Sequence, residues 1–470
     1  MKISILTSVF ILLIGISSTA KTTRSVASGN WNTSGTWDNG VPVPGDEVYI
    51  ENGDAVTLTA TTSISNLYIE GNSSSFTINT GVILFVSNYV VMIPTGNSQS
   101  NNLVINGTLY SSKGMSPRTV GGFTGYTANI SGSGLMQLVQ DLYNFSLSDG
   151  TMTVNLGCAV ECRDMYNYST GAASSMTLNL TDSINVKRNI ILQAQTVAAT
   201  SLTINMNNAS AKIRMGGVFD IRNNGGQITQ GTAESIFYFG NLSNYLVNAN
   251  IDYRNVGIES QTLSGNVNIS KVINNVIIDG GKTLTTNGND LLISAGNLVI
   301  NGNISASTGD VLSMAGSTAQ TITVNSATNV SVLDISNTSG GVSIAGSGSL
   351  NVTTGVTFST PAATALSTNG KVVLKDNGSG MASLGNLNSH TVSGNVTCEF
   401  RTQTLSNIEY RLLTVPITGV TLGDIDYNAS NCVDCLYTYG FPGSNWPSTG
   451  GIASTYSYNN GSVSSDFNEG

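Results

Sequence analysis

The sequence has 470 residues, of which only 10% are charged, and its formal net charge is −9. In ordinary folded domains about a quarter of the residues are charged, so neutral polar groups must keep this chain in solution. An acidic chain without a basic patch is a poor binder of phosphate backbones or anionic lipid, so we expect no nucleic-acid partner. The 40% hydrophobic content favours a folded chain over a disordered one.

The N-terminus has the pattern of a secretory signal peptide. Lys2 supplies a short positive region, and residues 3–16 are mainly apolar. This run is shorter than the roughly 20 apolar residues of a membrane-spanning helix. Small residues at 17–20 then provide a cleavage site after Ala20. We therefore expect residues 1–20 to be removed, a secreted or outer-surface location, and no integral membrane segment in the mature chain.

Downstream, short apolar clusters recur between Asn, Gly and Ser residues, which predicts strands. A helical repeat of apolar residues is not sustained anywhere, and residues 201–206 alternate between polar and apolar side chains. Gly and Asn between clusters tolerate the backbone conformations of tight corners. The clusters include Leu67–Ile69, Phe76–Ile78, Val82–Val86, Leu103–Ile105, Val276–Ile278, Leu291–Ile293 and Leu298–Ile300.

The spacing of these clusters predicts an all-β, right-handed parallel β-helix or solenoid. Clusters begin at Leu291, Leu298 and Ile304, so three sides would close a coil of about 20 residues. Inward side chains of stacked coils would then form one continuous core. Residues 281–399 contain a single aromatic residue, Phe358, which suits small coils. Tandem β-sandwiches remain the alternative, although sandwiches usually bury large aromatic residues.

The two ends of the chain differ in composition from the middle. All three Trp residues lie there, at Trp31, Trp37 and Trp446, and a solenoid needs its terminal coils covered. We predict a signal peptide at 1–20, an N-terminal cap and first coils at 21–110, and solenoid repeats at 111–399. A connector and the beginning of a distinct C-terminal β-domain, truncated in this chain, are predicted at 400–470.

The N-terminal region resembles a known extracellular module. Gly29-Asn30-Trp31, Gly35-Thr36-Trp37 and the segment from Val41 to Ile50 resemble the start of the domain family named for its eight glycines. The resemblance covers roughly residues 24–110. It implies a β-helical module of a surface protein.

A second resemblance covers about residues 394–470. The segments Gly394–Thr397, Glu409–Ile417 and Gly440–Ser444 are similar to parts of surface proteins exported by the bacterial type IX secretion system. Such proteins end in a sorting domain that is removed on attachment to surface lipopolysaccharide. The chain ends at Gly470 without one, so we expect either a fragment or a different route across the outer membrane.

The five cysteines suggest local disulfides. Cys158 and Cys162 are four positions apart, Cys432 and Cys435 are three apart, and Cys398 is left over. We expect the two close pairs to form loop disulfides, with redox or metal chemistry as the alternative. Cys398 would pair with a further domain or stay free. No cofactor and no metal site are expected.

Residues for catalysis are sparse. His390, the only histidine, lies in a polar stretch and is expected to be a solvated corner residue. The pairs Asp290 with Asp310 and Asp424 with Asp426 could be acid and base or calcium ligands, but we expect structural roles for them. Several Tyr residues could form a sugar-binding surface or pack between coils: Tyr143, Tyr166, Tyr168, Tyr238, Tyr245 and Tyr253.

These features favour a surface structural or adhesive repeat protein, without catalytic residues, that acts as a rigid stalk or contact surface. Its binding residues are unknown from the sequence. The expected partner is extracellular polysaccharide or a host or cell surface. The alternative is a carbohydrate-active enzyme, such as a polysaccharide lyase or glycosidase, or a sugar-binding β-helix protein.

Overall fold

A computed structural model describes residues 20–119, 123–146, 150–169, 175–194, 201–222, 226–229, 231, 234–242, 251–377, 380, 382–387, 389–399, 437–439 and 455–457. The chain divides into two units, Met1–Arg401 and Thr402–Gly470. In the second unit the described strands are β43 (Tyr437–Tyr439) and β44 (Thr455–Ser457), which pair antiparallel. The predicted pairs Asp424 with Asp426 and Cys432 with Cys435, together with Tyr245 and Trp446, lie outside the described residues.

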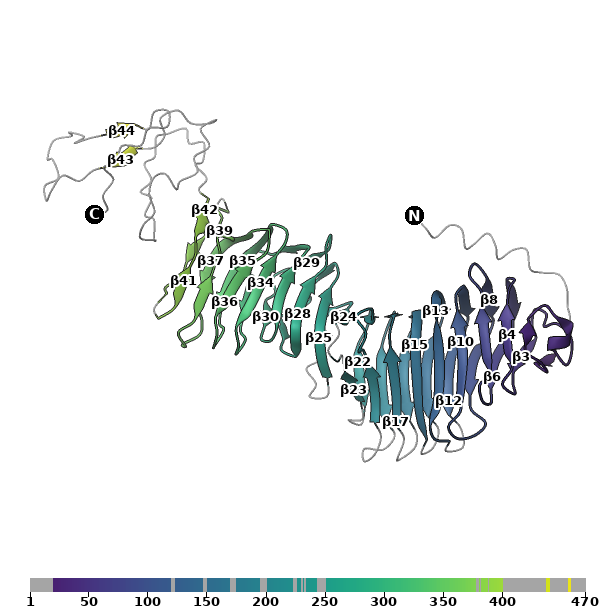
Figure 1. Ribbon diagram of the computed structural model, residues 1–470. Coiled ribbons are helices and arrows are strands. Elements are labelled where there is room, and N and C mark those ends of the chain that lie inside the picture. The colour runs from purple at the N-terminus through teal and green to yellow at the C-terminus, as the bar shows by residue number, and fades with distance from the viewer. Residues whose placement is uncertain are drawn as a thin grey trace. The chain divides into compact units, whose positions relative to one another are not determined.

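The first unit is a parallel β-solenoid of about 14 turns, which confirms the predicted fold class. Strands of successive coils lie side by side (Figure 1). A short 3₁₀ turn, η1 (Ser34–Thr36), lies in the first coil. In those same parts of the chain, no helix is long and apolar enough to cross a membrane.

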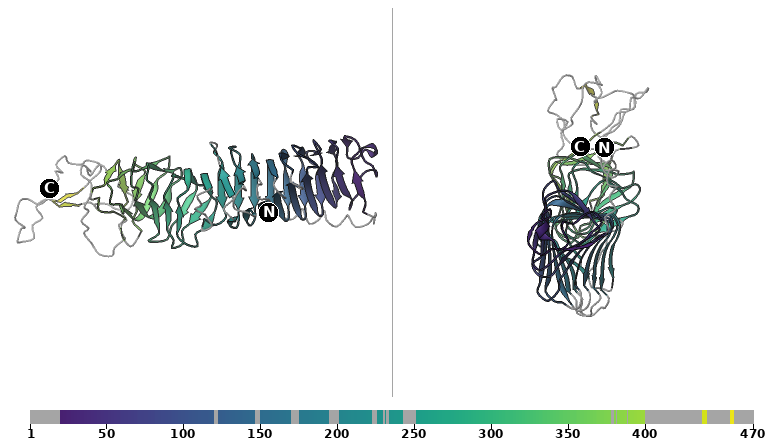
Figure 2. Two further views of the ribbon diagram at one scale, coloured as in Figure 1. Left: turned by 90° about the horizontal axis from the view of Figure 1, so that it is seen from below. Right: turned by 90° about the vertical axis from the view of Figure 1, so that its right-hand side faces the viewer.

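Two sheets run through the N-terminal part of the solenoid, and we call them sheets A and B. Each coil there contributes one strand to sheet A, and most coils contribute two to sheet B; the coils of β12 and β14 instead contribute one long strand each, β13 and β15, and the first coil contributes β2 alone. Figure 2 shows the coils stacked one against the next. The described strands of sheet A are β1 (Thr22–Arg24), β3 (Glu47–Ile50), β6 (Asn66–Glu70), β9 (Tyr89–Ile93), β12 (Gly114–Thr119), β14 (Asp141–Ser146), β16 (Met165–Ser169), β19 (Ile190–Ala194) and β22 (Phe219–Arg222).

Sheet B continues along the solenoid into its C-terminal part. Its described strands are β2 (Gly29–Asn30), β4 (Ala55–Leu58), β5 (Thr62–Ile64), β7 (Ser75–Ile78), β8 (Ile83–Val86), β10 (Ser100–Ile105), β11 (Thr108–Ser111), β13 (Tyr126–Leu138), β15 (Thr151–Cys162), β17 (Ser175–Leu180), β18 (Ser183–Val186), β20 (Ser201–Asn205), β21 (Lys212–Met215), β23 (Gly226–Thr229), β24 (Ile236–Phe239), β25 (Ile251–Ile258), β28 (Val272–Ile278), β31 (Asn297–Ile300), β34 (Gln320–Val324), β36 (Val342–Ala345), β38 (Ala365–Ser367) and β41 (Thr391–Ser393).

The cross-section changes at β25, which pairs with both β23 and β24 of the preceding coil. Beyond it, sheets C and D replace sheet A as the other two sides. Sheet C contains β26 (Gln261–Thr262), β29 (Thr283–Thr285) and β32 (Asn303–Ser305). Sheet D contains β27 (Val267–Ile269), β30 (Leu291–Ile293), β33 (Val311–Met314), β35 (Thr328–Ile335), β37 (Leu350–Thr357), β39 (Val372–Leu374), β40 (Ser383–Leu384) and β42 (Val396–Cys398).

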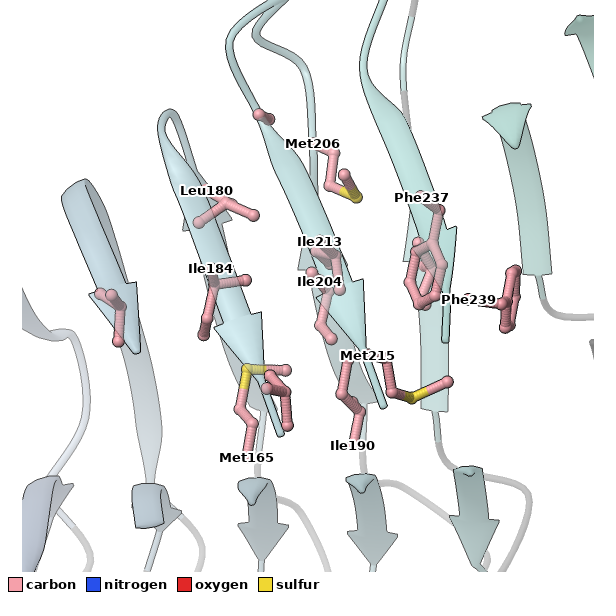
Figure 3. Close-up of a cluster of buried hydrophobic side chains, with 14 of the residues drawn as sticks. Met165, Leu180, Ile184, Ile190, Ile204, Met206, Ile213, Met215, Phe237 and Phe239 are labelled. Atoms are coloured by element: carbon pink, nitrogen blue, oxygen red, sulfur yellow. The ribbon is translucent and has the colours of Figure 1, made fainter. Parts of the chain in front are cut away.

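The core is continuous because inward positions stack on inward positions of the next coil. In β15 every second residue is buried, and its outward neighbours are partly exposed. Register pairs place Ile184, Ile213 and Phe237 in one row, and Figure 3 shows these side chains on successive strands. Fully burying such a side chain contributes about 1.5–3 kcal/mol. Each coil therefore stabilises its neighbours through side chains of the same inward row.

The N-terminal end of the core is aromatic. Trp31 and Trp37 are almost fully buried, and their ring centroids are 5.1 Å apart in an edge-to-face arrangement. The Trp37 indole Nε1–H donates to the Trp31 carbonyl at 2.7 Å. Trp31 also packs on Phe76 of a later coil. This is the geometry that aromatic pairs prefer, with the polar indole group satisfied.

Candidate functional site

Asp290 and Asp310 both accept hydrogen bonds from backbone N–H groups at corners of the coil. Asp310 is 5% exposed and accepts backbone N–H groups from Ser307 at 2.9 Å and Gly288 at 3.2 Å. Asp290 accepts the Val311 N–H at 2.9 Å. Both carboxylates therefore stabilise corners of the coil. The adjoining cavity of about 10 Å³ has an apolar lining, and this volume holds at most about one water molecule, not a sugar.

His390 is not the solvated residue that its polar neighbours predict. Its side chain is 7% exposed and stacks on Phe358, with ring centroids 5.0 Å apart. Its Nδ1 accepts the backbone N–H of Thr364 at 3.2 Å. The prediction is wrong because the corner turns this ring inward, where it packs on an aromatic ring and satisfies a buried donor.

The predicted disulfide between Cys158 and Cys162 is also wrong. Both thiols are free and buried, and both point into the core from β15. Four positions along a strand separate Cα atoms by about 13 Å, whereas disulfides need less than about 7 Å. Burial raises the pKa of each thiol to about 12. Such thiols are inert side chains of the core at neutral pH. Cys398 is free and half-buried.

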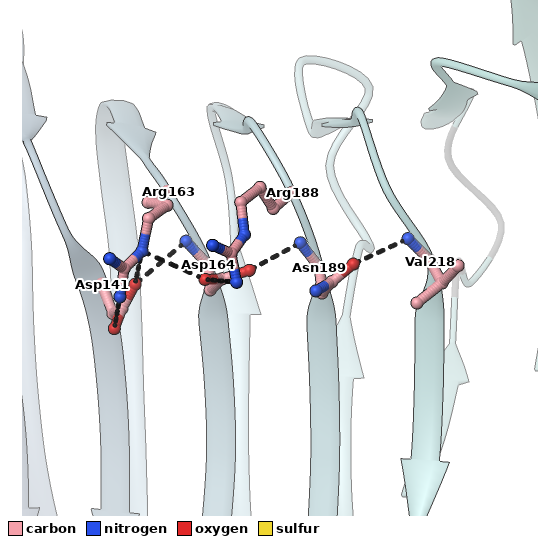
Figure 4. A network of polar contacts seen from close by, with 6 residues as sticks. All are labelled: Asp141, Arg163, Asp164, Arg188, Asn189 and Val218. Atoms are coloured by element: carbon pink, nitrogen blue, oxygen red, sulfur yellow. Dashed lines mark hydrogen bonds and ion pairs between the residues drawn. The ribbon is translucent and has the colours of Figure 1, made fainter.

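Acidic residues also build an ordered corner where the chain enters the sheet A strands β14, β16 and β19. Asp164 is fully buried and accepts the Asn189 N–H at 2.8 Å, while Arg163 and Arg188 pair with its Oδ2 at 3.2 Å (Figure 4). Asp141 binds Arg163 through two hydrogen bonds, which raise the pKa of the guanidinium.

The same corner position repeats this arrangement in neighbouring coils. Asp141 accepts the Asp164 N–H at 3.2 Å, and Asn189 accepts the Val218 N–H at 3.0 Å. Each side chain thus satisfies the N–H of the next coil. The cluster is a structural ladder, and its carboxylates have no open side for a substrate.

The candidate tyrosines that the structure describes divide between buried positions and the outer face of sheet A. Tyr253 is fully buried, and Tyr238 is 4% exposed with the Arg214 guanidinium 4.6 Å from its ring centroid. Tyr143 and Tyr166 lie on the outer face of sheet A, with parallel rings 4.4 Å apart. Burial, followed by the neighbouring Tyr166, raises the pKa of Tyr143 to about 12, so it stays neutral. Tyr168 lies next to them on β16.

The most regular outward surface is on sheet B, and the sequence interpretation missed it. Four successive coils each carry Thr, an apolar residue, Asn and another apolar residue, beginning at 127, 153, 177 and 203. The register places the Thr residues in one column and the Asn residues in a second. We call this surface the Thr-Asn face; it consists of Thr127, Thr153, Thr177, Thr203, Asn129, Asn155, Asn179 and Asn205, with Ser100 and Asn102 extending it on β10.

The Asn side chains of this face form a hydrogen-bonded ladder. Asn129 donates to Asn102 at 3.0 Å, and Asn155 donates to Asn129 at 2.7 Å. The ladder continues from Asn179 to Asn155 at 2.8 Å and from Asn205 to Asn179 at 3.2 Å. These outward side chains are partly exposed, and none of the residues in the two columns is charged. The ladder therefore holds a fixed array of hydroxyl, methyl and amide groups at the surface.

Within the part of the chain that the structure describes, no group of three or more His, Cys, Asp or Glu residues could hold a metal ion.

Comparison with protein families, with curated proteins and with solved structures found no match for this chain.

Proposed function

We propose that this chain is an exported cell-surface structural and adhesive protein, whose solenoid serves as a rigid stalk and as a contact surface. The signal-peptide pattern supports export. The continuous core supports rigidity, because bending the stack would open the packing between inward rows of neighbouring coils.

The Thr-Asn face is the observation that carries the proposal. Its groups repeat from coil to coil, so a ligand with its own regular surface would make the same contact several times. Repeated weak contacts reach a high combined strength when they are held in one rigid body. Meanwhile Asp290, Asp310 and His390 are engaged in holding backbone groups.

A second candidate function is sugar binding on the outer face of sheet A. The Tyr143 and Tyr166 pair favours it, because Tyr143 is 38% exposed and aromatic rings stack on sugars. A second stacked pair, Tyr49 and Tyr68, lies on the same sheet with ring centroids 4.4 Å apart. Changing Tyr143 and Tyr166 to Ala would abolish polysaccharide binding if this face were the site.

The proposal is tested by displaying the mature chain on a non-adherent bacterial cell. We expect attachment to at least one extracellular material from a panel of polysaccharide-coated, host-cell and ice surfaces. The purified chain is screened in parallel against acidic and neutral polysaccharides, with and without calcium, and we expect no product. Release of reducing ends or unsaturated uronates that disappears in Asp290→Asn with Asp310→Asn would favour the enzyme instead.

A further inference from the structure

We infer that the Thr-Asn face binds ice, so that the contact surface holds its ligand by matching the repeat of a water lattice. The inference deepens the proposed contact function and rests on it. A crystalline surface is the ligand class that a regular protein array fits, because each coil then meets an equivalent lattice position.

The spacing of the array follows from strand geometry. The register pairs Thr153 with Thr177 and Thr177 with Thr203 on adjacent strands. Their side chains therefore repeat at the strand spacing, about 4.8 Å. Along one strand, Thr153 and Asn155 are two residues apart, or about 6.6 Å. A crystalline surface also repeats in two directions, so a face with two fixed repeats has the kind of geometry that such a surface can match. A protein surface with both repeats can therefore order water in the pattern of the crystal.

The side chains also have the chemistry that such a surface needs. Each Thr presents a hydroxyl group that continues a water network and a methyl group around which water forms a cage. The Asn ladder fixes the second column through four hydrogen bonds of 2.7–3.2 Å. Long sheets remain untwisted when specific side-chain ladders stabilise them. Little conformational entropy is then lost when the lattice forms on the face.

The Thr-Asn face carries no charged side chain in its two columns, and this favours ice over other ligands. None of the residues in the two columns is charged or aromatic. A strongly hydrated charge would hold water in an orientation that the lattice does not accept, and neutral groups avoid this. A polysaccharide site would instead use exposed aromatic rings, which this chain carries on sheet A. Neutral hydrogen-bonding columns with two fixed repeats are thus complementary to a neutral crystal of water.

The test measures capture of the full mature chain by a slowly growing ice surface, together with inhibition of ice recrystallisation. We expect the chain to be enriched in the ice fraction. Thr153→Tyr with Thr177→Tyr puts bulky rings into the centre of the face and should lower capture by at least about tenfold. The matched control is Thr323→Tyr, an outward and partly exposed Thr of β34 outside the two columns, which should leave capture unchanged.

Folding of each variant is checked by the strand signal in circular dichroism. Wild-type exclusion from ice, equal to that of a non-binding protein, would overturn the inference whatever the variants do. Equal capture of wild type and the double Thr variant would also overturn it. If displayed cells attach to a polysaccharide while the purified chain is excluded from ice, the contact function stands and the ice ligand fails. If neither ice nor any other surface is bound, both proposals fail.

Discussion

Replacement of Asp164 tests whether corner carboxylates act as structural acceptors. The side chain is fully buried and receives the Asn189 N–H at 2.8 Å. Asp164→Ala would leave that N–H without its acceptor, whereas Asp164→Asn keeps an oxygen in place. Asn189 shows that an amide suffices in this column, because its Oδ1 accepts the Val218 N–H at 3.0 Å.

The magnitude can be worked from these contacts. An unsatisfied buried N–H costs about 1–3 kcal/mol. The two ion pairs of Asp164 involve Arg163 and Arg188 side chains that are 38% and 58% exposed, so each contributes at most about 1 kcal/mol. We therefore expect Asp164→Ala to destabilise the corner by about 1–5 kcal/mol. Asp164→Asn should cost at most about 2 kcal/mol, because only the ion pairs are lost.

The appropriate assay is native-state hydrogen exchange of peptides that contain Asn189, because stacked coils can open locally without global unfolding. Protection should fall in the order wild type, Asp164→Asn, Asp164→Ala. Peptides from the distant strand β34 serve as the internal control and should not change. Equal loss of protection in the two variants would refute the assignment of Asp164 as an acceptor for the next coil.

Three further predictions concern the core cysteines, a closely packed glycine and the corner histidine. Burial raises the pKa of Cys158 and Cys162 from an ordinary value near 9 to about 12. Between these two pH values the thiols ionise only in the unfolded chain, so folding stability should be intact below pH 9 and decline as the pH rises toward 12. In an alkaline titration, the double Cys→Ala variant should lose its strand signal at a higher pH than the wild type. Gly132→Ala should lower the free energy of unfolding by about 1–3 kcal/mol, because φ is +121° and the new Cβ would lie 2.2 Å from a backbone oxygen. In the control variant Gly35→Ala the new Cβ meets no neighbouring atom, so thermal unfolding should not change. His390→Phe should keep the ring stack but lower hydrogen-exchange protection at this corner, since a buried N–H loses its acceptor at a cost of about 1–3 kcal/mol; unchanged protection would contradict this.

The sequence predicted the coil because the apolar clusters mark its sides. The clusters at Leu291, Leu298 and Ile304 are β30, β31 and β32, which lie in three different sheets. The coil is somewhat longer than expected: Leu298 pairs with Ile322, and 322 minus 298 is 24 residues. The corners contain further polar residues between the apolar clusters, so the spacing of the clusters alone underestimates the number of residues in a coil.

The Thr-Asn face was harder to predict because its repeat is uneven. From Thr127 to Thr153, Thr177 and Thr203 the steps are 153 minus 127, or 26, then 177 minus 153, or 24, then 203 minus 177, or 26. Corners of variable length change the period in sequence while the strands keep their register. Only the pairing shows that these residues form columns.

Side-chain direction explains the remaining errors. Cys158 and Cys162 are close in sequence, but an extended strand holds them apart with both side chains inward. His390 is surrounded by polar residues, yet the three-dimensional corner places it against Phe358. Local composition does not contain this information, because it depends on which coil lies next to the corner.

The most direct test of the contact surface is attachment of cells that display chains with whole coils removed. Deleting residues 129–178 joins Ala128 to Asn179 in register and removes two coils of the Thr-Asn face, together with the Tyr143 and Tyr166 pair of sheet A. Deleting residues 298–343 joins Asn297 to Ile344 and removes two coils elsewhere. Both chains should fold, since coils contact mainly their neighbours. We expect attachment to fall with the first deletion and to persist with the second; equal attachment of the two chains would contradict the Thr-Asn face as the contact surface.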